Sequence, residues 1–313
     1  MRYCIGIDLG GTNIAGGIAD LDGKLLLTDS IKTGLPCPAS DIADRIALLC
    51  RRMATALGLA LSDAAWVGIG APGSVDVDTG TVLYANNLEF DNVPLGQMIH
   101  ERTGLPVYVD NDANVAAWGE YCAGAGKGSS SMVMVTLGTG VGGGVIVNGK
   151  VIDGTHGAGG EIGHITVNPH ETAACGCGKH GCLEQYSSAT GVVRCMKKLL
   201  DENPDADCVL RGKDFEAKDV FDAARSGDAL AAREVDKMTD TLGMALASIA
   251  STTDPEMFLI GGGVARAGDV LFDPLVEHFK TYAFKSCRET PIKAASLGND
   301  AGIYGAVRLI VGE

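Results

Sequence analysis

Basic residues are scarce in this chain of 313 residues, where 25 lysines and arginines are outnumbered by 39 aspartates and glutamates. The formal net charge is −14, and the densest basic pairs, Arg51-Arg52 and Lys197-Lys198, both lie in helix-like sequence. Proteins that bind nucleic acids or anionic membrane surfaces usually carry a basic patch or arm. We therefore expect neither nucleic acid nor membrane as a partner.

Long hydrophobic runs are also missing. No apolar stretch reaches the ~18 residues of a membrane span, and the N-terminus, MRYCIGIDLGG, enters a strand pattern without a signal peptide. We expect a cytoplasmic protein in which the ten cysteines are mostly reduced. The P-loop pattern GxxxxGK[ST] is absent, and the glycine-rich turns lead into hairpins rather than helices. These features argue against P-loop and Rossmann nucleotide sites.

Glycine, in contrast, is abundant, with 44 residues that cluster beside apolar stretches. Residues 3–26 and 132–152 share one order of features. Each segment has an apolar strand, a glycine-rich turn (LGGTN or LGTGVGG), a second strand, a tight Asp-Gly or Asn-Gly turn, and a lysine before a further apolar run. Asp-Gly and Asn-Gly favour the type I′ turns of hairpins. We interpret the two segments as a duplicated architecture.

Strands and helices alternate along the rest of the chain, which predicts the α/β class. Apolar strands are expected over 65–71, 106–110 and 256–260. Helical periodicity and capping residues predict helices over 40–60, 94–104, 113–123, 184–201, 216–225, 228–252 and 301–311.

Three glycine-rich turns follow apolar strands and are candidates for binding a nucleotide. A carboxylate at such a turn can hold a hydrated Mg²⁺ near phosphate oxygens, and glycines let backbone N–H groups approach phosphate closely. The third turn, in IGGGV, is a candidate for contact with the base or ribose. The residues concerned are Asp8, Gly10, Gly11, Thr12, Asn13, Gly138, Thr139, Gly140, Gly261, Gly262 and Gly263.

The segment VDNDAN, residues 109–114, follows a strand and precedes a helix. Ligands of open α/β sheets bind at the carboxyl ends of strands, and phosphoryl transfer to an alcohol requires a group that accepts the hydroxyl proton. Asp112 is the candidate base, and Asn111 is a candidate partner of a neighbouring hydroxyl. A helix N-cap is an equally good interpretation of Asp112 from the local sequence.

The stretch CGCGKHGCLE contains Cys175, Cys177 and Cys182. Thiolates and an imidazole suit tetrahedral Zn²⁺, and a Cys₃His set is a closed structural site without a position for substrate. A redox pair would be expected as C-x-x-C, and a disulfide would leave one thiol unpaired in a reducing compartment. Spacing alone leaves three candidates for the histidine ligand, namely His164, His170 and His180.

The motifs IDLGGTN, VDNDAN, LGTGVGGG, GGEIGH and CGCGKHGCLE occur in this order along the chain. Together they resemble the ROK family of sugar kinases and sugar-responsive repressors. The resemblance implies the actin-like ATPase (ribonuclease H-like) fold, with two α/β domains around a cleft that closes on the sugar. We expect one domain over 1–118 plus about 300–313, and a larger one over 119–299.

The same resemblance implies a role for several residues. Asp112 would be the general base toward the 6-hydroxyl of the sugar, and ATP would be bound with Mg²⁺. The sugar-binding residues would be Asn87, Asn111, Asp112, Glu161, His164 and Glu184. The family pattern also selects one histidine, so that the ligands of a structural Zn²⁺ would be His164, Cys175, Cys177 and Cys182.

Repressors of the family carry a DNA-binding segment before the first phosphate loop. Only seven residues precede Asp8 here, so we expect a kinase. The stretch through SSATG resembles the branch that phosphorylates glucose. Kinases for N-acetylmannosamine, N-acetylglucosamine, allose or fructose, and a non-catalytic sugar sensor, are the alternatives. The resemblance also implies a homo-oligomer, either a dimer or a tetramer.

Overall fold

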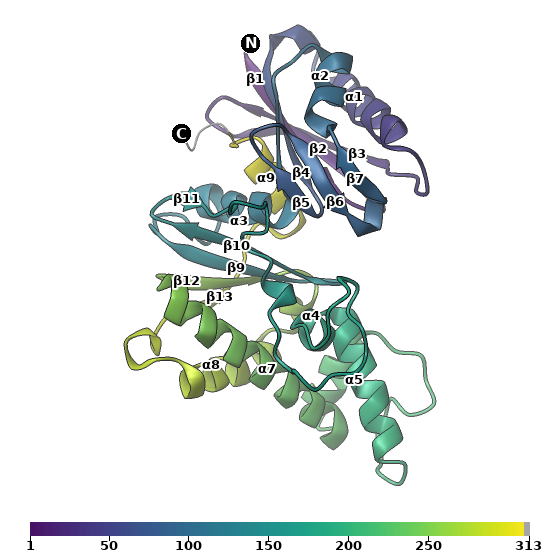
Figure 1. Ribbon diagram of the computed structural model, residues 1–313, viewed down its shortest axis with the longest axis vertical. Helices are drawn as coiled ribbons and strands as arrows, with labels where there is room; N and C mark the ends of the chain where they lie inside the picture. Colours follow the sequence, from purple (N-terminus) through teal and green to yellow (C-terminus); the bar gives the residue numbers. More distant parts are fainter. Residues whose placement is uncertain (310–313) are drawn as a thin grey trace. The chain divides into compact units, whose positions relative to one another are not determined.

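The computed structural model describes residues 1–309 and divides into two compact units (Figure 1). Unit 1 comprises Met1–Ser130, Gly144–Gly160 and the chain from Ser296 onward, whereas unit 2 comprises Ser131–Gly143 and Glu161–Ala295. These limits differ from the expected domains, because 119–130 and 144–160 lie in unit 1. A boundary at 118 would cut a continuous helix, α3 (Asp112–Ala123).

Unit 1 is built on a five-stranded sheet of order β3-β2-β1-β4-β8. The first three strands are antiparallel, and β4 and β8 run parallel to β1. Every residue of β1 is buried except Asp8, which is partly buried, as expected for a central apolar strand. The strands are β1 (Tyr3–Leu9), β2 (Asn13–Asp20), β3 (Leu25–Lys32), β4 (Ala64–Ala71) and β8 (Val107–Asn111).

The α-helices in the described part of this unit are α1 (Ala39–Ala56), α2 (Leu95–Thr103), α3 and α9 (Ala301–Ala306). Ile42, Ile46, Leu49 and Met53 of α1 are fully buried and recur at helical spacing. Helix α9 lies directly against β4, since a Cβ on Gly68 would be 1.9 Å from the carbonyl oxygen of Ala306.

A small antiparallel sheet completes unit 1. It consists of β5 (Ser74–Asp76), β6 (Thr81–Ala85) and β7 (Phe90–Val93) in that order. A single 3₁₀ turn, Asn86–Leu88, connects β6 to β7. This turn carries Asn87 at an exposed position.

The second five-stranded sheet has the order β11-β10-β9-β12-β13. Strands β9, β12 and β13 are parallel to one another, and the unit boundary at 143/144 falls within β10. Strands β9 and β12 carry the second and third glycine-rich turns at their carboxyl ends. The strands are β9 (Met132–Leu137), β10 (Val141–Val147), β11 (Lys150–Val151), β12 (Met257–Gly261) and β13 (Ile292–Ala294).

Unit 2 carries five α-helices, of which α4, α5, α7 and α8 are labelled in Figure 1. Helices α7 and α8 pack against each other, and Phe279 of α8 meets Phe258 of β12 edge to face with ring centroids 5.7 Å apart. This packing forms the core behind the third glycine-rich turn. The helices are α4 (Glu184–Ser187), α5 (Ala189–Glu202), α6 (Ala217–Arg225), α7 (Ala229–Thr253) and α8 (Asp269–Tyr282).

The duplicated order of strand, glycine turn, strand, tight turn and strand is confirmed as β1-β2-β3 and β9-β10-β11. The single helix expected over 184–201 is wrong. Ser188 has extended backbone (φ −77°, ψ 165°), and its side chain accepts the N–H of Gly191 to cap a separate helix, α5.

Two further differences concern the C-terminal part of the chain. Helix α8 was not expected from the sequence, and the last helix, expected over 301–311, ends at Ala306; residues 310 and 311 lie outside the described part. Among residues 1–309, no helix is both long and apolar enough to cross a membrane.

Candidate active site

The predicted general base, Asp112, is the first residue of α3 and directly follows β8. Asn111 caps this helix, because its Oδ1 accepts the N–H groups of Ala113 at 2.9 Å and Asn114 at 3.1 Å. The alternative interpretation of Asp112 as the N-cap is therefore wrong. Asp112 Oδ1 itself accepts the N–H of Ala113 at 2.8 Å.

Both polar atoms of the Asn111 side-chain amide form hydrogen bonds within the protein. Its oxygen caps α3, and its Nδ2 donates to the carbonyl oxygen of Gly73 at 2.8 Å. Asn111 thus fastens the start of α3 to the segment between β4 and β5. The expected contact of Asn111 with a sugar hydroxyl stays a prediction. A sugar hydroxyl would have to bond to Oδ1 or Nδ2, which already bond to backbone groups.

Unit 1 concentrates buried carboxylates around β1 and β8. Burial, followed by the nearby charge of Asp112, raises the pKa of Asp8 to about 6. Burial and the charge of Asp153 raise the pKa of Asp110 to about 7. Asn114 bridges Asp110 and Asp153, with Nδ2 at 3.3 Å and 3.2 Å from their oxygens. Such a density of negative charge favours binding a divalent cation or a proton.

The first glycine-rich turn is held by a residue that the motif analysis missed. Thr33 is fully buried; its Oγ1 donates to the carbonyl oxygen of Gly10 at 2.6 Å, and its N–H donates to that of Thr12 at 3.0 Å. The predicted sugar ligand Asn87 also lies near this turn, since a Cβ on Gly11 would be 3.9 Å from Asn87 Nδ2. No sequence motif marks Thr33, which lies just beyond β3.

The second glycine-rich turn lies in unit 2 with the predicted ligand Glu184. The turn closes on itself, as Gly138 N–H donates to Gly140 O at 3.0 Å. Glu184 Oε2 accepts the N–H of Val141 at 3.0 Å. The third turn meets the second, because a Cβ on Gly262 (φ +83°) would lie 2.4 Å from the carbonyl oxygen of Leu137. Only glycine suits this close approach at a left-handed φ.

A cavity of about 970 Å³ opens beside the second and third turns, entirely within unit 2. Cavities of this size suit cofactors and nucleotides. Its wall combines Thr139 and Gly263 from the two turns with apolar side chains of α5 and α6 and a rim of basic groups. Among the lining residues are Val193, Phe215, Phe221, Lys197 and Arg225.

The cysteine-rich stretch converges on one histidine. The ligand atoms of His164, Cys175, Cys177 and Cys182 all lie within 4.8 Å of one another. Cys175 Sγ is 3.8 Å from His164 Nδ1, and Cys177 Sγ is 3.7 Å from Cys182 Sγ. Tetrahedral bonds of ~2.3 Å to sulfur place ligand atoms about 3.8 Å apart. The cluster therefore fits a metal ion, and the 3.7 Å separation of the two thiols is no disulfide.

Electrostatics of the cluster also favour a cation. Burial, followed by the hydrogen bond that its thiol donates to Cys177, raises the pKa of Cys182 to about 12. Crowded thiols of this kind lose their protons when a cation binds. The other nitrogen of His164, Nε2, is 3.8 Å from Glu161 Oε2, so one imidazole contacts both the thiol cluster and a predicted sugar ligand.

Comparisons with known proteins identify the family. The sequence profile described as ROK family matches residues 4–313. A glucokinase of Halalkalibacterium halodurans is 40% identical over 99% of this chain and 95% of its own length. A glucokinase of Thermotoga maritima is 39% identical, with 98% and 96% covered. The chain belongs to the ROK family.

A solved ROK structure agrees with this assignment. The crystal structure of a ROK family glucokinase from Streptomyces griseus, in complex with glucose and AMPPNP, is 39% identical, covers 98% of both chains and gives a TM-score of 0.81. The actin-like ATPase fold expected from the sequence is thus confirmed for this ROK chain.

The predicted site residues of this ROK chain fall into two groups. Asp8, Asn87, Asn111 and Asp112 belong to unit 1, whereas Glu161, His164 and Glu184 belong to unit 2. Within unit 1 the structure brings Asp112 near Asp8, and within unit 2 it brings Glu161 near His164. Their individual roles in the reaction stay predictions.

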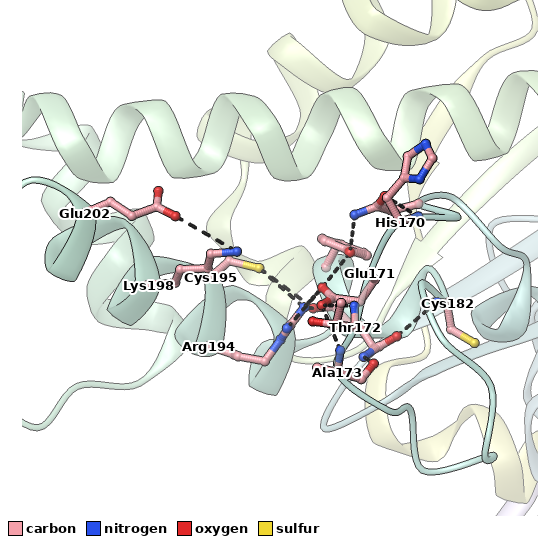
Figure 2. Close-up of polar contacts among 12 residues, drawn as sticks. His170, Glu171, Thr172, Ala173, Cys182, Arg194, Cys195, Lys198 and Glu202 are labelled. Atoms are coloured by element: carbon pink, nitrogen blue, oxygen red, sulfur yellow. Dashed lines mark hydrogen bonds and ion pairs between the residues drawn. The ribbon is translucent and has the colours of Figure 1, made fainter.

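A polar network of the ROK chain next to the cysteine-rich stretch was not expected (Figure 2). Glu171 accepts hydrogen bonds from Ala173 N–H at 3.0 Å and Tyr186 Oη at 2.7 Å, and it pairs with Arg194 at 3.3 Å. These bonds, that of Ala173 foremost, lower the pKa of Glu171 to about 2. Arg194 also lines the large cavity, so the network joins the cavity wall to the cysteine-rich stretch.

Gln185 fixes the cysteine-rich stretch of the ROK chain from within. Its Oε1 accepts the N–H of Cys182 at 3.1 Å, and its Nε2 donates to the carbonyl oxygen of Ala173 at 2.9 Å. Arg194 donates to the carbonyl oxygen of Gln185 at 2.9 Å. The position of Gln185 directly after Glu184 was the only sequence signal for this role, because the contacts of Gln185 span up to 12 residues of chain.

Proposed function

We propose that this ROK chain transfers the γ-phosphoryl group of ATP to the 6-hydroxyl of glucose, giving glucose 6-phosphate and ADP. The observation that carries this proposal is the 38–40% identity to glucokinases over nearly the full length of the chain. The glucose and AMPPNP bound by the Streptomyces griseus relative support the same pair of substrates.

Asp112 acts as the general base in the proposed reaction. It takes the proton of the 6-hydroxyl while the hydroxyl oxygen attacks the γ-phosphorus, so a new P–O bond forms and the bond to the β-phosphate oxygen breaks. Asp112 lies at the carboxyl end of β8, where open α/β sheets bind ligands. Positioning and charge stabilisation supply most of the catalysis in such transfers.

In the proposal the base of the nucleotide binds in the cavity of about 970 Å³, and the first and second glycine-rich turns are the proposed phosphate-binding segments of unit 1 and unit 2, respectively. Mg²⁺ supplies neutralisation of the charge on the phosphates. Asp8 is the residue that would hold it, because it is the last but one residue of β1, beside the first turn. Its raised pKa of about 6 fits a carboxylate whose charge a cation would stabilise.

The thiol cluster holds a structural Zn²⁺ in the proposal. His164 and the three cysteines form a closed set of four ligands, which leaves no position for water or substrate. His164 and the three cysteines would hold the ion, and a bound ion would tie the segment that carries Glu161 and His164 to the cysteine-rich stretch that precedes Glu184 at the start of α4. Glu161, His164 and Glu184 are the proposed ligands of the sugar hydroxyls in unit 2, and Asn87 and Asn111 are the proposed ligands in unit 1.

A hexose panel tests the proposed function. ADP release is measured with glucose, N-acetylmannosamine, N-acetylglucosamine, allose and fructose, alongside a reaction without sugar. We expect glucose to give the highest kcat/KM and the reaction without sugar to give almost no ADP. Faster turnover of another hexose would reassign the substrate, and binding of glucose without any ADP release would indicate a sensor rather than a kinase.

A further inference from the structure

Glu184 makes a contact that its expected role in sugar binding does not require. Its Oε2 accepts the N–H of Val141 at 3.0 Å, and Val141 is the last residue of the second phosphate loop, which we define as Gly138–Val141. A Cβ on Gly140 would lie 2.2 Å from the same oxygen. The carboxylate therefore packs directly against the phosphate loop. It fits there because Gly140 has no side chain.

The other carboxylate oxygen of Glu184 points to the thiol cluster. Cys175 Sγ lies 3.8 Å from Oε1, so one carboxylate spans the distance between a predicted metal ligand and the phosphate loop. Glu184 is only partly buried. The side chain can thus receive a ligand hydroxyl while it holds both neighbours.

Two other segments fasten the same phosphate loop. A Cβ on Gly163, in the segment that carries Glu161 and His164, would be 2.1 Å from Val141 O. From α5, Ala189 N–H donates to Gly138 O at 2.8 Å, and Thr190 Oγ1 donates to Thr139 O at 2.7 Å. The loop is therefore packed against the segments that carry the predicted sugar ligands of unit 2 and against α5, which lines the nucleotide cavity.

We infer that Glu184 is a positioning residue through which sugar binding orders the second phosphate loop, so that glucose and nucleotide bind with positive coupling. This inference rests on the proposed function. A sugar hydroxyl that donates to Glu184 restricts its carboxylate, and the bond to Val141 then restricts the loop. The nucleotide that binds second has less ordering to complete and binds more tightly. Coupling is reciprocal, so nucleotide tightens glucose by the same factor.

A matched pair of glycine substitutions tests the coupling. Gly140→Ala places a methyl group where Glu184 Oε2 lies, whereas a Cβ on Gly138 meets nothing within 4 Å. Neither glycine has a left-handed φ, so alanine is compatible with both backbones. The atom displaced by Gly140→Ala is the end of a flexible side chain, which lets the fold persist while the carboxylate moves.

The readout is the Kd of glucose measured by calorimetry on the metal-loaded protein without any nucleotide. We expect Gly140→Ala to weaken glucose binding about fivefold or more, and Gly138→Ala to stay within about twofold of the wild type, by analogy with typical coupling factors. A substitution in the phosphate loop would then change the Kd of glucose although no nucleotide is present. Equal glucose affinity in the two variants would overturn the inference.

A second measurement uses the wild-type protein only. Saturating AMPPNP should lower the Kd of glucose by about fivefold, and this ratio should approach one in Gly140→Ala. A wild-type ratio of one would overturn the inference even though glucose is phosphorylated. Absence of glucose binding and of ADP release in the wild type would instead refute the proposed function, so the two failures are distinguishable.

Discussion

Asp112 and Asp110 lie two residues apart at the end of β8 and differ in their surroundings. Asp112 begins α3 and is partly buried, whereas Asp110 is only 7% exposed and sits beside Asn114 and Asp153. This difference separates their expected effects. We expect substitution of Asp112 to change turnover and substitution of Asp110 to change stability.

Asp112→Asn removes the proposed proton acceptor and keeps the shape of the side chain. General base catalysis contributes typically 10²–10⁴-fold, so we expect kcat to fall by at least about 10²-fold while the Kd of glucose changes by less than about threefold. Steady-state assays and calorimetry measure the two quantities. Turnover close to that of the wild type would remove Asp112 as the base.

Asp110→Asn should stabilise the protein at alkaline pH. The folded-state pKa of Asp110 is about 7, above its usual 3.8, so ionisation opposes folding progressively as pH rises from about 4 through 7. Asparagine keeps an oxygen for Asn111 N–H and Asn114 and carries no charge. We expect a gain on the order of 2–4 kcal/mol in the free energy of unfolding at pH 8.

The gain should shrink as pH falls toward 3.8, the usual pKa of the group, and vanish below it, where Asp110 is protonated in both states. Urea unfolding at pH 5 and pH 8 measures it, with the exposed Asp205→Asn as the control. If the difference in free energy of unfolding between Asp110→Asn and the wild type were the same at pH 5 and pH 8, the raised pKa would be contradicted.

At the scale of elements, short segments hold the two phosphate loops and the thiol cluster. Thr33 lies between β3 and α1 and bonds to the first loop, and α5 bonds to the second loop through its first two residues. The position of each loop therefore depends on the neighbouring segment that bonds to it.

Thr33→Val removes the hydroxyl that donates to Gly10 O at 2.6 Å and conserves the side-chain volume. A buried acceptor that loses its partner costs about 1–3 kcal/mol, and the loop that carries Gly10 should shift. We expect the KM for ATP to rise about threefold or more, with the Kd of glucose nearly unchanged. Thr33→Ser, which keeps the donor, should behave as the wild type; equal effects of both variants would refute this role.

Cys177→Ser removes one of the four proposed metal ligands. We expect elemental analysis to find about one zinc per chain in the wild type and much less in the variant, because four-ligand closure stabilises such sites. The melting temperature should fall, and the Kd of glucose should rise more than that of AMPPNP, since the cluster adjoins Glu161 and Glu184. Cys208→Ser, outside the cluster, is the control. A metal-free wild type with full activity would contradict the structural role.

For the whole molecule, strong local signals in the sequence predicted the architecture. Apolar strands that end in glycine turns marked β1, β9 and β12, and the Asp-Gly and Asn-Gly turns marked both hairpins. Helix α5 was merged with α4 because Ser188 acts as a cap inside an otherwise helical pattern, and local periodicity does not reveal such a break.

Contacts between distant segments were beyond any local signal. Glu171 pairs with Arg194 across 23 residues, and Thr33 reaches Gly10 across the same separation. The motif order indicated His164 as the metal ligand only through the family resemblance, and the cluster geometry now agrees with it. The contact between Glu184 and Val141 spans 43 residues, and it became visible only in the fold.

The most direct test of the account follows both products of one reaction. Wild-type protein is incubated with ATP, Mg²⁺ and glucose, and phosphorus NMR quantifies ADP and the sugar phosphate. We expect glucose 6-phosphate and ADP in equal amounts, and neither product without glucose. Release of ADP without an equal amount of glucose 6-phosphate, or phosphate on another hydroxyl, would contradict it.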